Sequence, residues 1–176
     1  MNKAVVEEER TVIRMIVKND DSFLSLFSAS ETPVISTEVA DFIENSTVSI
    51  PPAAPLALHI YSNCIDEAEK REYGRAICAY YAERYRANER ERGRNRRIVL
   101  LLALVGILFL SIALFLDYSN CFLWAEVMDV AAWVFLWEAV DIGAFRNRDL
   151  RLNRMRYRSY MTMSMTYYPL EEQKKA

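Results

Sequence analysis

Four carboxylates within an otherwise apolar segment are the residues of this sequence best placed to do chemistry. Glu126 and Asp129 stand three residues apart, and so do Glu138 and Asp141. On a helix each pair shares a turn, and all four project within about half of the circumference. Rings of such carboxylates around an oligomer axis would favour cations, whereas a partner helix bearing Lys or Arg would dock against them.

A second constellation consists of His59, Cys64 and Asp66, which can be written as a base, a nucleophile and an orienting acid. Their spacing fits no known constellation, so an ordinary sheet or surface histidine is the favoured interpretation. The cysteines, Cys64, Cys78 and Cys121, match neither a disulfide framework nor a metal-ligand spacing, and the four isolated glycines form no phosphate loop. The sequence therefore predicts a non-enzymatic protein with no metal site and no cofactor.

Two apolar stretches surround a short polar turn. Residues 98–116 carry no charge, and at ~1.5 Å per residue a helix of this length reaches about 28 Å, which matches the hydrocarbon core of a bilayer. Residues 121–145 are long enough to cross and rich in Trp, Phe, Val and Ala, but they hold the four carboxylates. Each carboxylate costs ~2.5–3.5 kcal/mol near mid-bilayer, so this stretch is the weaker candidate span.

Arginine clusters border both stretches, while residues 98–145 contain no Lys or Arg. Because basic residues near span ends mark the cytoplasmic side, both flanks are predicted to lie inside, and residues 117–120 form the outer turn. The rival interpretation is one span followed by an amphipathic helix in the interface, which would leave the second cluster outside. The clusters, predicted to face lipid, are Arg90, Arg92, Arg94, Arg96 and Arg97 before the first stretch and Arg146, Arg148, Arg151, Arg154, Arg156 and Arg158 after the second.

This topology gives the two carboxylate pairs different expected surroundings. Glu138 and Asp141 lie near the cytoplasmic end, where arginines of either cluster can reach them as ion-pair partners. Glu126 and Asp129 have no base on their side of the membrane. They must be protonated, hydrated at the interface, or satisfied by a cation or another protein.

Small residues mark one face of the first stretch. Ala103, Gly106 and Ala113 let another helix approach closely. That helix is either the second stretch of the same hairpin or a helix of another copy, so the expected partners are membrane lipid and a second copy or another membrane protein. Topology and anionic lipid already account for the arginine clusters, so nucleic acid is not predicted as a partner.

The remaining residues predict a small cytoplasmic α+β domain. Residues 7–18 favour a short helix, with acids in its first turn. A second short helix is capped by Ser36 or Thr37. Prolines separate residues 47–50 from residues 56–61, and both segments are predicted to be extended.

The second half of this domain depends on distant segments. Asn63, followed by Asp66, signals the start of a long amphipathic helix, with a break expected at Gly93. Residues 160–167 alternate Met with small hydroxyl residues, which predicts a strand. Because a lone strand is not stable in water, this tail is predicted to return and pair with residues 56–61.

Three short segments carry a resemblance. They read LHIYSNCIDEAE at residues 58–69, WEAVDIGAF at 137–145 and RNRDLRLNR at 146–154. Together they cover 30 of the 176 residues. With these segments the chain resembles uncharacterised two-span membrane proteins of anaerobic gut bacteria. The resemblance implies a bacterial inner membrane and supplies no activity, catalytic residue or ligand.

The sequence thus predicts a membrane α+β protein, in which a transmembrane two-helix hairpin presents a small cytoplasmic α+β domain and both termini are cytoplasmic. The expected role is an anchor, a sensor or an assembly subunit acting through that domain. The alternative is a homo-oligomeric cation or proton pathway lined by the second-span carboxylates. The predicted segments are an α+β segment at 1–64, an amphipathic to basic helix at 65–97, the hairpin at 98–145 with spans 98–116 and 121–145, and a basic segment with a C-terminal strand at 146–176.

Overall fold

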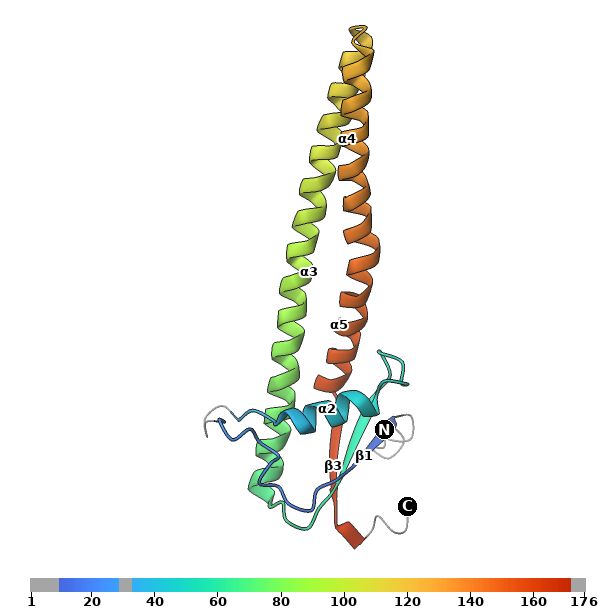
Figure 1. Ribbon diagram of the computed structural model, residues 1–176. Coiled ribbons are helices and arrows are strands. Elements are labelled where there is room, and N and C mark those ends of the chain that lie inside the picture. Colours follow the sequence, from blue (N-terminus) through green and yellow to red (C-terminus); the bar gives the residue numbers. More distant parts are fainter. Residues whose placement is uncertain (1–9, 29–32, 172–176) are drawn as a thin grey trace, which may run out of the picture. The chain divides into compact units, whose positions relative to one another are not determined.

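The computed structural model of this protein describes residues 10–28 and 33–171 (Figure 1). Within these ranges the chain is mostly helical, with one small three-stranded parallel sheet. It divides into two compact units. Unit 1 comprises the described residues up to Arg86 and from Asn153 onward, and unit 2 comprises Ala87–Leu152. Unit 1 is therefore assembled from both ends of the chain, and unit 2 is inserted between them in the sequence.

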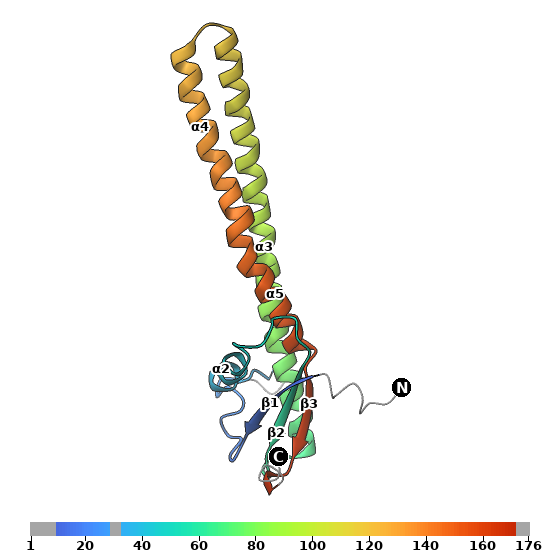
Figure 2. The same ribbon diagram turned by 90° about the vertical axis from the view of Figure 1, so that its right-hand side faces the viewer.

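The sheet of unit 1 joins segments that are far apart in the sequence. Its strands lie in the order β1 (Thr11–Ile16), β2 (Leu56–Tyr61) and β3 (Ser164–Tyr168), and both neighbouring pairs are parallel (Figure 2). The predicted pairing of the C-terminal tail with β2 is confirmed. The strand starts later than the predicted 160–167 because Tyr160 still belongs to a helix.

Strand β1 replaces the helix predicted over residues 7–18, of which 7–9 lie outside the described residues. Its burial has a period of two, since Ile13 and Met15 are buried and their neighbours are exposed. The local signal for a helix was wrong here because hydrogen bonding to β2 overrides local propensity, and a strand receives this bonding only from a distant partner.

Helix α2 (Thr37–Ser46) begins where the sequence predicts it. The side chain of Ser36 accepts a hydrogen bond from a backbone N–H of the first turn, as an N-cap residue does. Residues 47–50, predicted to be extended, instead form turns. The hydroxyl of Thr47 donates to the carbonyl of Ile43 at 3.0 Å and so keeps the chain curled at the end of the helix.

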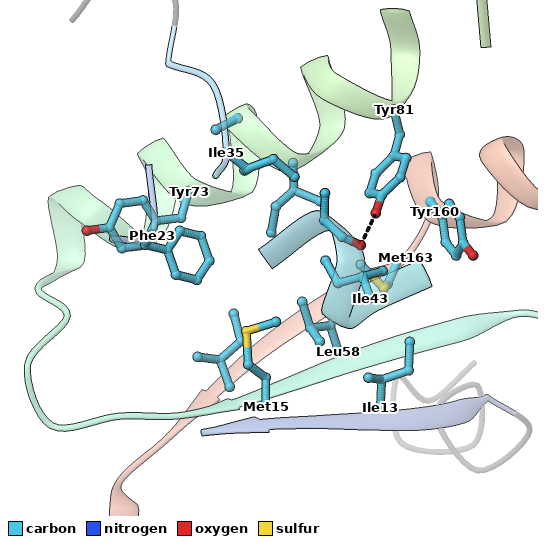
Figure 3. Packing of buried hydrophobic residues seen from close by; sticks show 14 of the residues in the cluster. Ile13, Met15, Phe23, Ile35, Ile43, Leu58, Tyr73, Tyr81, Tyr160 and Met163 are labelled. Atoms are coloured by element: carbon cyan, nitrogen blue, oxygen red, sulfur yellow. Dashed lines mark hydrogen bonds between the residues drawn. The ribbon is translucent and has the colours of Figure 1, made fainter. Parts of the chain in front are cut away.

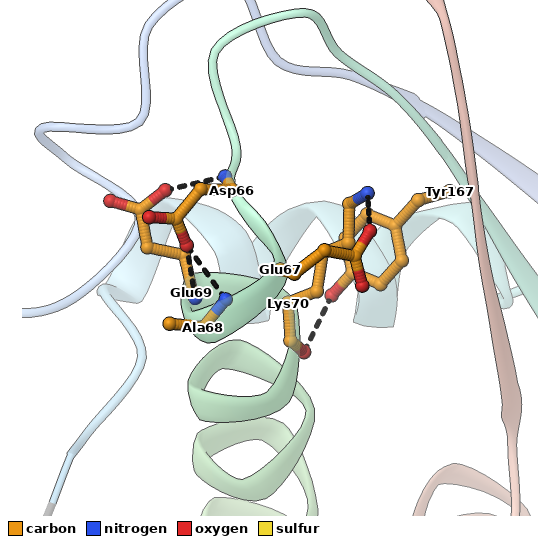
Figure 4. Close-up of polar contacts among 6 residues, drawn as sticks. All are labelled: Asp66, Glu67, Ala68, Glu69, Lys70 and Tyr167. Atoms are coloured by element: carbon orange, nitrogen blue, oxygen red, sulfur yellow. Dashed lines mark hydrogen bonds and ion pairs between the residues drawn. The ribbon is translucent and has the colours of Figure 1, made fainter.

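Helix α3 (Glu67–Tyr118) begins with a capping box (Figure 4). Asp66 Oδ1 accepts hydrogen bonds from the N–H groups of Ala68 and Glu69 at 2.7 and 2.8 Å, and Glu69 Oε2 accepts one from the Asp66 N–H at 2.7 Å. Asp66 rather than Asn63 therefore caps the helix, whose first residue is Glu67. The Asn63 side chain accepts a hydrogen bond from the backbone just beyond β3.

One face of the sheet packs on the helices of unit 1. Figure 3 shows Ile13, Met15 and Leu58 pointing from the sheet toward Ile43 of α2 and Tyr81 of α3. Leu58, Ile43 and Tyr81 are completely buried. Burying such side chains stabilises a domain by about 1.5–3 kcal/mol each, so this layer is the main stabilising element of unit 1.

Two tyrosines connect the C-terminal helix to this core. Helix α5 (Asn147–Met161) brings Tyr160 against Tyr81, with ring centroids 4.6 Å apart. The hydroxyls of Tyr160 and Thr47 lie 2.5 Å apart in a hydrogen bond, and the Tyr81 hydroxyl donates to the Ala40 carbonyl at 3.4 Å. The end of the chain is thereby tied to α2 as well as to the sheet.

Unit 2 contains two helical stretches that run side by side in opposite directions (Figures 1 and 2). The chain turns back after α3 at Asn120, whose φ of 59° is a left-handed conformation that asparagine tolerates. Helix α4 (Phe122–Val140) follows and continues through a π-helical segment, η1 (Asp141–Arg146), into α5. The break expected at Gly93 is absent, since α3 is continuous there.

Among the described helices, α3 alone is long and apolar enough to cross a membrane. Only 11% of its most apolar stretch is buried within the structure. Helix α4 has 19 residues, but Glu126, Asp129 and Glu138 fall within it. Its composition alone therefore does not identify it as a second span.

Candidate functional site: the helical hairpin of unit 2

The two helices of unit 2 approach closely at Gly106. A Cβ atom at this position would lie 2.7 Å from Leu136 Cγ and 3.3 Å from the carbonyl oxygen of Ala132. Nearby, the rings of Phe109 and Phe135 stack with centroids 5.4 Å apart. Glycine is required here because any side chain would push α3 and α4 apart.

Small residues continue this contact along both helices. Alanine recurs at every seventh position of α4, as Ala125, Ala132 and Ala139, and all three are buried. On α3, Ala113 is buried and Ala103 is half-buried. The sequence prediction named the small residues of the first helix only, although the seven-residue spacing of alanine on the second is equally visible in the sequence.

The two carboxylates nearer the turn of the hairpin, Glu126 and Asp129, lie at a groove. Glu126 and Asp129 line it together with Asp117, and its volume is about 220 Å³. Glu126 is exposed and Asp129 is half-buried. In the described part of the chain, no group of His, Cys, Asp or Glu residues is arranged to hold a metal ion. Lined by these carboxylates, the groove is therefore acidic.

The inner carboxylates, Glu138 and Asp141, are both exposed. Across residues 10–28 and 33–171, neither of them forms an ion pair with an arginine. The ion pairs expected at this end of the hairpin are therefore not formed. Arginine on α3 pairs along its own helix instead, as Arg92 does with Glu89 at 3.8 Å.

The arginine clusters occupy different surroundings. Arg90, Arg94 and Arg97 line a shallow groove on α3 beside Ile98, where the charged part of the helix gives way to the apolar part. Within unit 1, Arg154 Nε donates to the hydroxyl of Tyr85 at 3.3 Å. In the second cluster, Arg146, Arg148, Arg151 and Arg158 are exposed, and Arg154 and Arg156 are half-buried.

Asparagines fill part of the hairpin interior outside the apolar stretch. Asn88 is 6% exposed, and its Nδ2 donates to the carbonyl of Leu150 at 2.8 Å. Asn95, seven residues later on the same helix face, is 5% exposed and its Nδ2 lacks a hydrogen-bond partner, as does the buried Oδ1 of Asn147. A buried amide group without a partner costs about 1–3 kcal/mol, so this stretch is held less tightly than the alanine contact.

The residues of the possible catalytic constellation have other roles. The carboxylate of Asp66 caps α3 and is unavailable as an orienting acid. The ring of His59 packs on Tyr168 with centroids 4.9 Å apart, and Cys64 Sγ lies 3.1 Å from Ser62 Oγ. The geometry thus offers no support for catalysis by these residues.

Buried tyrosines in unit 1 are held in their neutral form. Burial raises the pKa of Tyr81 and Tyr160, and burial together with a hydrogen bond to Asp20 raises the pKa of Tyr73. Burial also raises the pKa of Tyr167 to about 12. These phenols stay protonated at neutral pH, so they serve as structural hydrogen-bond donors; Tyr167, for example, donates to a backbone carbonyl of α3 at 3.1 Å (Figure 4).

No protein family, curated protein or solved structure matches this chain. The resemblance to two-span membrane proteins of gut bacteria stays an expectation from the sequence. What the protein does is therefore inferred from the hairpin, its charges and the sheet that closes unit 1.

Proposed function

We propose that this protein is a two-span membrane protein of the cytoplasmic membrane, in which the hairpin holds unit 1 in the cytoplasm as an anchor, a sensor or an assembly subunit. The pairing of β2 with β3 is the observation that carries the proposal. β2 precedes the hairpin and β3 follows it, and two strands hydrogen-bonded in one sheet lie on the same side of a membrane. If α3 crosses the bilayer, the chain must cross back before β3, and α4 is the helix available to do so.

The exposed surface of α4 supports this second crossing. Trp124, Trp133 and Trp137 are each more than 60% exposed, and so are Val130 and Val134. Soluble proteins rarely expose so many large apolar side chains together, whereas lipid would cover them. Glu126 and Glu138 lie near opposite ends of the helix, where the cost of inserting a carboxylate is lower than at mid-bilayer.

The orientation follows from the two arginine clusters. One precedes the apolar stretch of α3 and the other follows η1, while residues 98–145 between them contain no basic residue. Such asymmetry places the clusters on the cytoplasmic side, together with unit 1. Anionic lipid headgroups then supply the counter-charges.

The native cysteines provide a test of this topology. Cys121 is exposed at the turn of the hairpin, and Cys64 and Cys78 are exposed in unit 1. In variants that retain one cysteine and carry serine at the other two positions, we expect a membrane-impermeant maleimide to label Cys121 on intact cells. Cys64 and Cys78 should be labelled only after the membrane is opened. Labelling of Cys64 from outside would contradict the proposed orientation.

A fourth reporter separates the two-span topology from its rival. Glu171 is exposed just beyond β3, and Glu171→Cys can be placed in a background without native cysteines. The proposed topology protects this position on intact cells. Labelling from outside would favour a single span followed by a helix in the interface.

A cation or proton pathway is the second candidate function, favoured by the groove that Asp117, Glu126 and Asp129 form without a base. Reconstitution into liposomes that contain a pH-sensitive or potassium-sensitive dye tests it. We expect no flux above that of protein-free liposomes. Flux that disappears in the Glu126→Gln, Asp129→Asn variant would favour the pathway.

A further inference from the structure

We propose that unit 1 binds an extended peptide segment of another protein along the outer edge of β1, with a carboxylate of that peptide facing Arg14. The binding site consists of this strand edge and the adjoining groove between β1 and α2. The inference rests on the proposed function, because it names the partner class through which a membrane-anchored unit 1 would act. Strand addition of this kind takes affinity from the main chain and specificity from alternate side chains.

The outer edge of β1 presents backbone groups without a strand partner. The N–H groups of Thr11 and Val17 donate to carbonyls at the β2 side, at 2.9 and 3.0 Å. Along a parallel strand, alternate residues direct their N–H and C=O groups to opposite sides. Those of Val12, Arg14 and Ile16 therefore point away from β2, and within the described sheet no strand lies beyond them.

A groove of about 470 Å³ lies beside the end of β1. Met15 and Ile16 of β1 line one side, and Val39 and Phe42 of α2 line the other. In Figure 2, α2 lies toward the β1 side of the sheet and β3 lies at the opposite edge. Phe42 is 39% exposed although its helix packs on the core, so part of its ring is accessible in the groove. A peptide added at β1 would direct every second side chain against Val39 and Phe42.

The other face of the same edge determines the charge of the peptide. Val12 and Ile16 are 41% and 45% exposed, and the exposed Arg14 lies between them. A peptide strand beside them matches this face when it presents a carboxylate between apolar side chains. Opposite charges on neighbouring strands stabilise the pair, and like charges directly opposite destabilise it.

The same charge disfavours a second copy of this chain as the occupant. When two β1 strands pair in opposite directions with full overlap, Arg14 lies directly opposite Arg14 of the other copy. If one strand is shifted along the other, this contact is avoided, but fewer residues of the two strands form hydrogen bonds. An acidic, extended segment of another protein satisfies both the backbone and the charge.

The test uses the full chain in detergent micelles and a fluorescein-labelled peptide of nine residues. One strand face of the peptide presents a single glutamate between valines, and the other face presents leucine. We expect saturable binding by fluorescence anisotropy, and about tenfold weaker binding of the same peptide with lysine in place of glutamate. Arg14→Glu should reverse the preference between the two peptides. Equal binding of both peptides to both proteins would overturn the proposal.

A second variant removes one outward backbone donor. Val12→Pro deletes an N–H that faces away from β2, so the hydrogen bonds between β1 and β2 remain, and proline is tolerated at such edge positions. We expect about tenfold weaker peptide binding, whereas Val12→Thr, which keeps the N–H, should bind like the unmodified protein. Near-ultraviolet circular dichroism of the tyrosines checks that both variants are folded. Unchanged binding in Val12→Pro would contradict strand addition.

A separate measurement tests whether two copies of this chain pair through their β1 edges. The double variant Val12→Cys, Ile16→Cys, in a background without native cysteines, keeps Arg14 and would place its cysteines opposite each other in two paired copies; it should stay monomeric under mild oxidation. Rapid formation of a disulfide-linked dimer would show that a second copy occupies the edge and would overturn the proposal. A protein that is labelled at Cys121 from outside but does not bind the peptide refutes the peptide site alone, and the proposed topology stands.

Discussion

Replacing Tyr160 with alanine should lower the free energy of unfolding of unit 1 by about 3–5 kcal/mol, because the ring is completely buried. The variant loses the ring contact with Tyr81 and the hydrogen bond to Thr47, and it leaves a cavity where α5 meets α2. Since domains of this size are stable by only about 5–15 kcal/mol, we expect a large shift of the denaturation midpoint. Urea denaturation in detergent, followed by near-ultraviolet circular dichroism of the tyrosines, measures it.

Two control variants test whether loss of the buried ring causes the lower stability of Tyr160→Ala. Tyr160→Phe keeps the ring and removes only the hydroxyl, so a loss of about 1 kcal/mol is expected. Tyr118→Ala removes a tyrosine that is 88% exposed, and it should leave the midpoint unchanged. An equal effect of Tyr118→Ala and Tyr160→Ala would contradict the assignment of Tyr160 to the core of unit 1.

Replacing Gly106 with leucine should separate the two helices of unit 2 and destabilise the hairpin by about 1–3 kcal/mol or more, as overpacking does. The Cβ atom of the new side chain would lie 2.7 Å from Leu136 Cγ and 3.3 Å from the carbonyl oxygen of Ala132. All three tryptophans of the chain lie on α4, so their fluorescence reports this contact. Titration with sodium dodecyl sulfate should unfold the variant at a lower concentration.

Gly93 offers a matched control on the same helix. Nothing lies within 4 Å of a Cβ atom built there, so Gly93→Leu meets open space. Because glycine is less favourable than leucine or alanine inside a helix, this change should be neutral or stabilising by up to about 1 kcal/mol. If Gly93→Leu and Gly106→Leu destabilise the hairpin equally, close approach of the helices at Gly106 is not the cause of the effect.

The sequence could predict the parts of the fold that have a local signal and those that need a particular kind of partner to be stable. Ser36 predicts the start of α2 because a serine side chain at an N-cap accepts a hydrogen bond from a backbone N–H of the first turn. The pairing of the tail with β2 could be predicted because an alternating segment has to find a partner strand to be stable. The close approach at Gly106 is a property of a small residue within an apolar helix, so it too is visible in the sequence.

The parts that could not be predicted depend on distant contacts. The segment that contains β1 locally favours a helix with acids in its first turn. Only hydrogen bonds to β2, 45 residues away, make it a strand. The groove beside β1 depends on where α2 packs, which no local pattern encodes. Asn95 reads as part of an arginine-rich solvated helix, and its burial follows from the fold of unit 2.

The division of unit 1 between the two ends of the chain has a consequence for biogenesis. β3 leaves the ribosome after both helices of the hairpin, so the sheet is completed only after the hairpin has been synthesised. Until then β2 lacks one neighbour, and the tyrosine carried by α5 is missing from the core. In the proposed topology, a chain whose hairpin is inserted incorrectly has β3 on the other side of the membrane from β2. Folding of unit 1 would then depend on correct insertion of the hairpin, which would act as a checkpoint during synthesis.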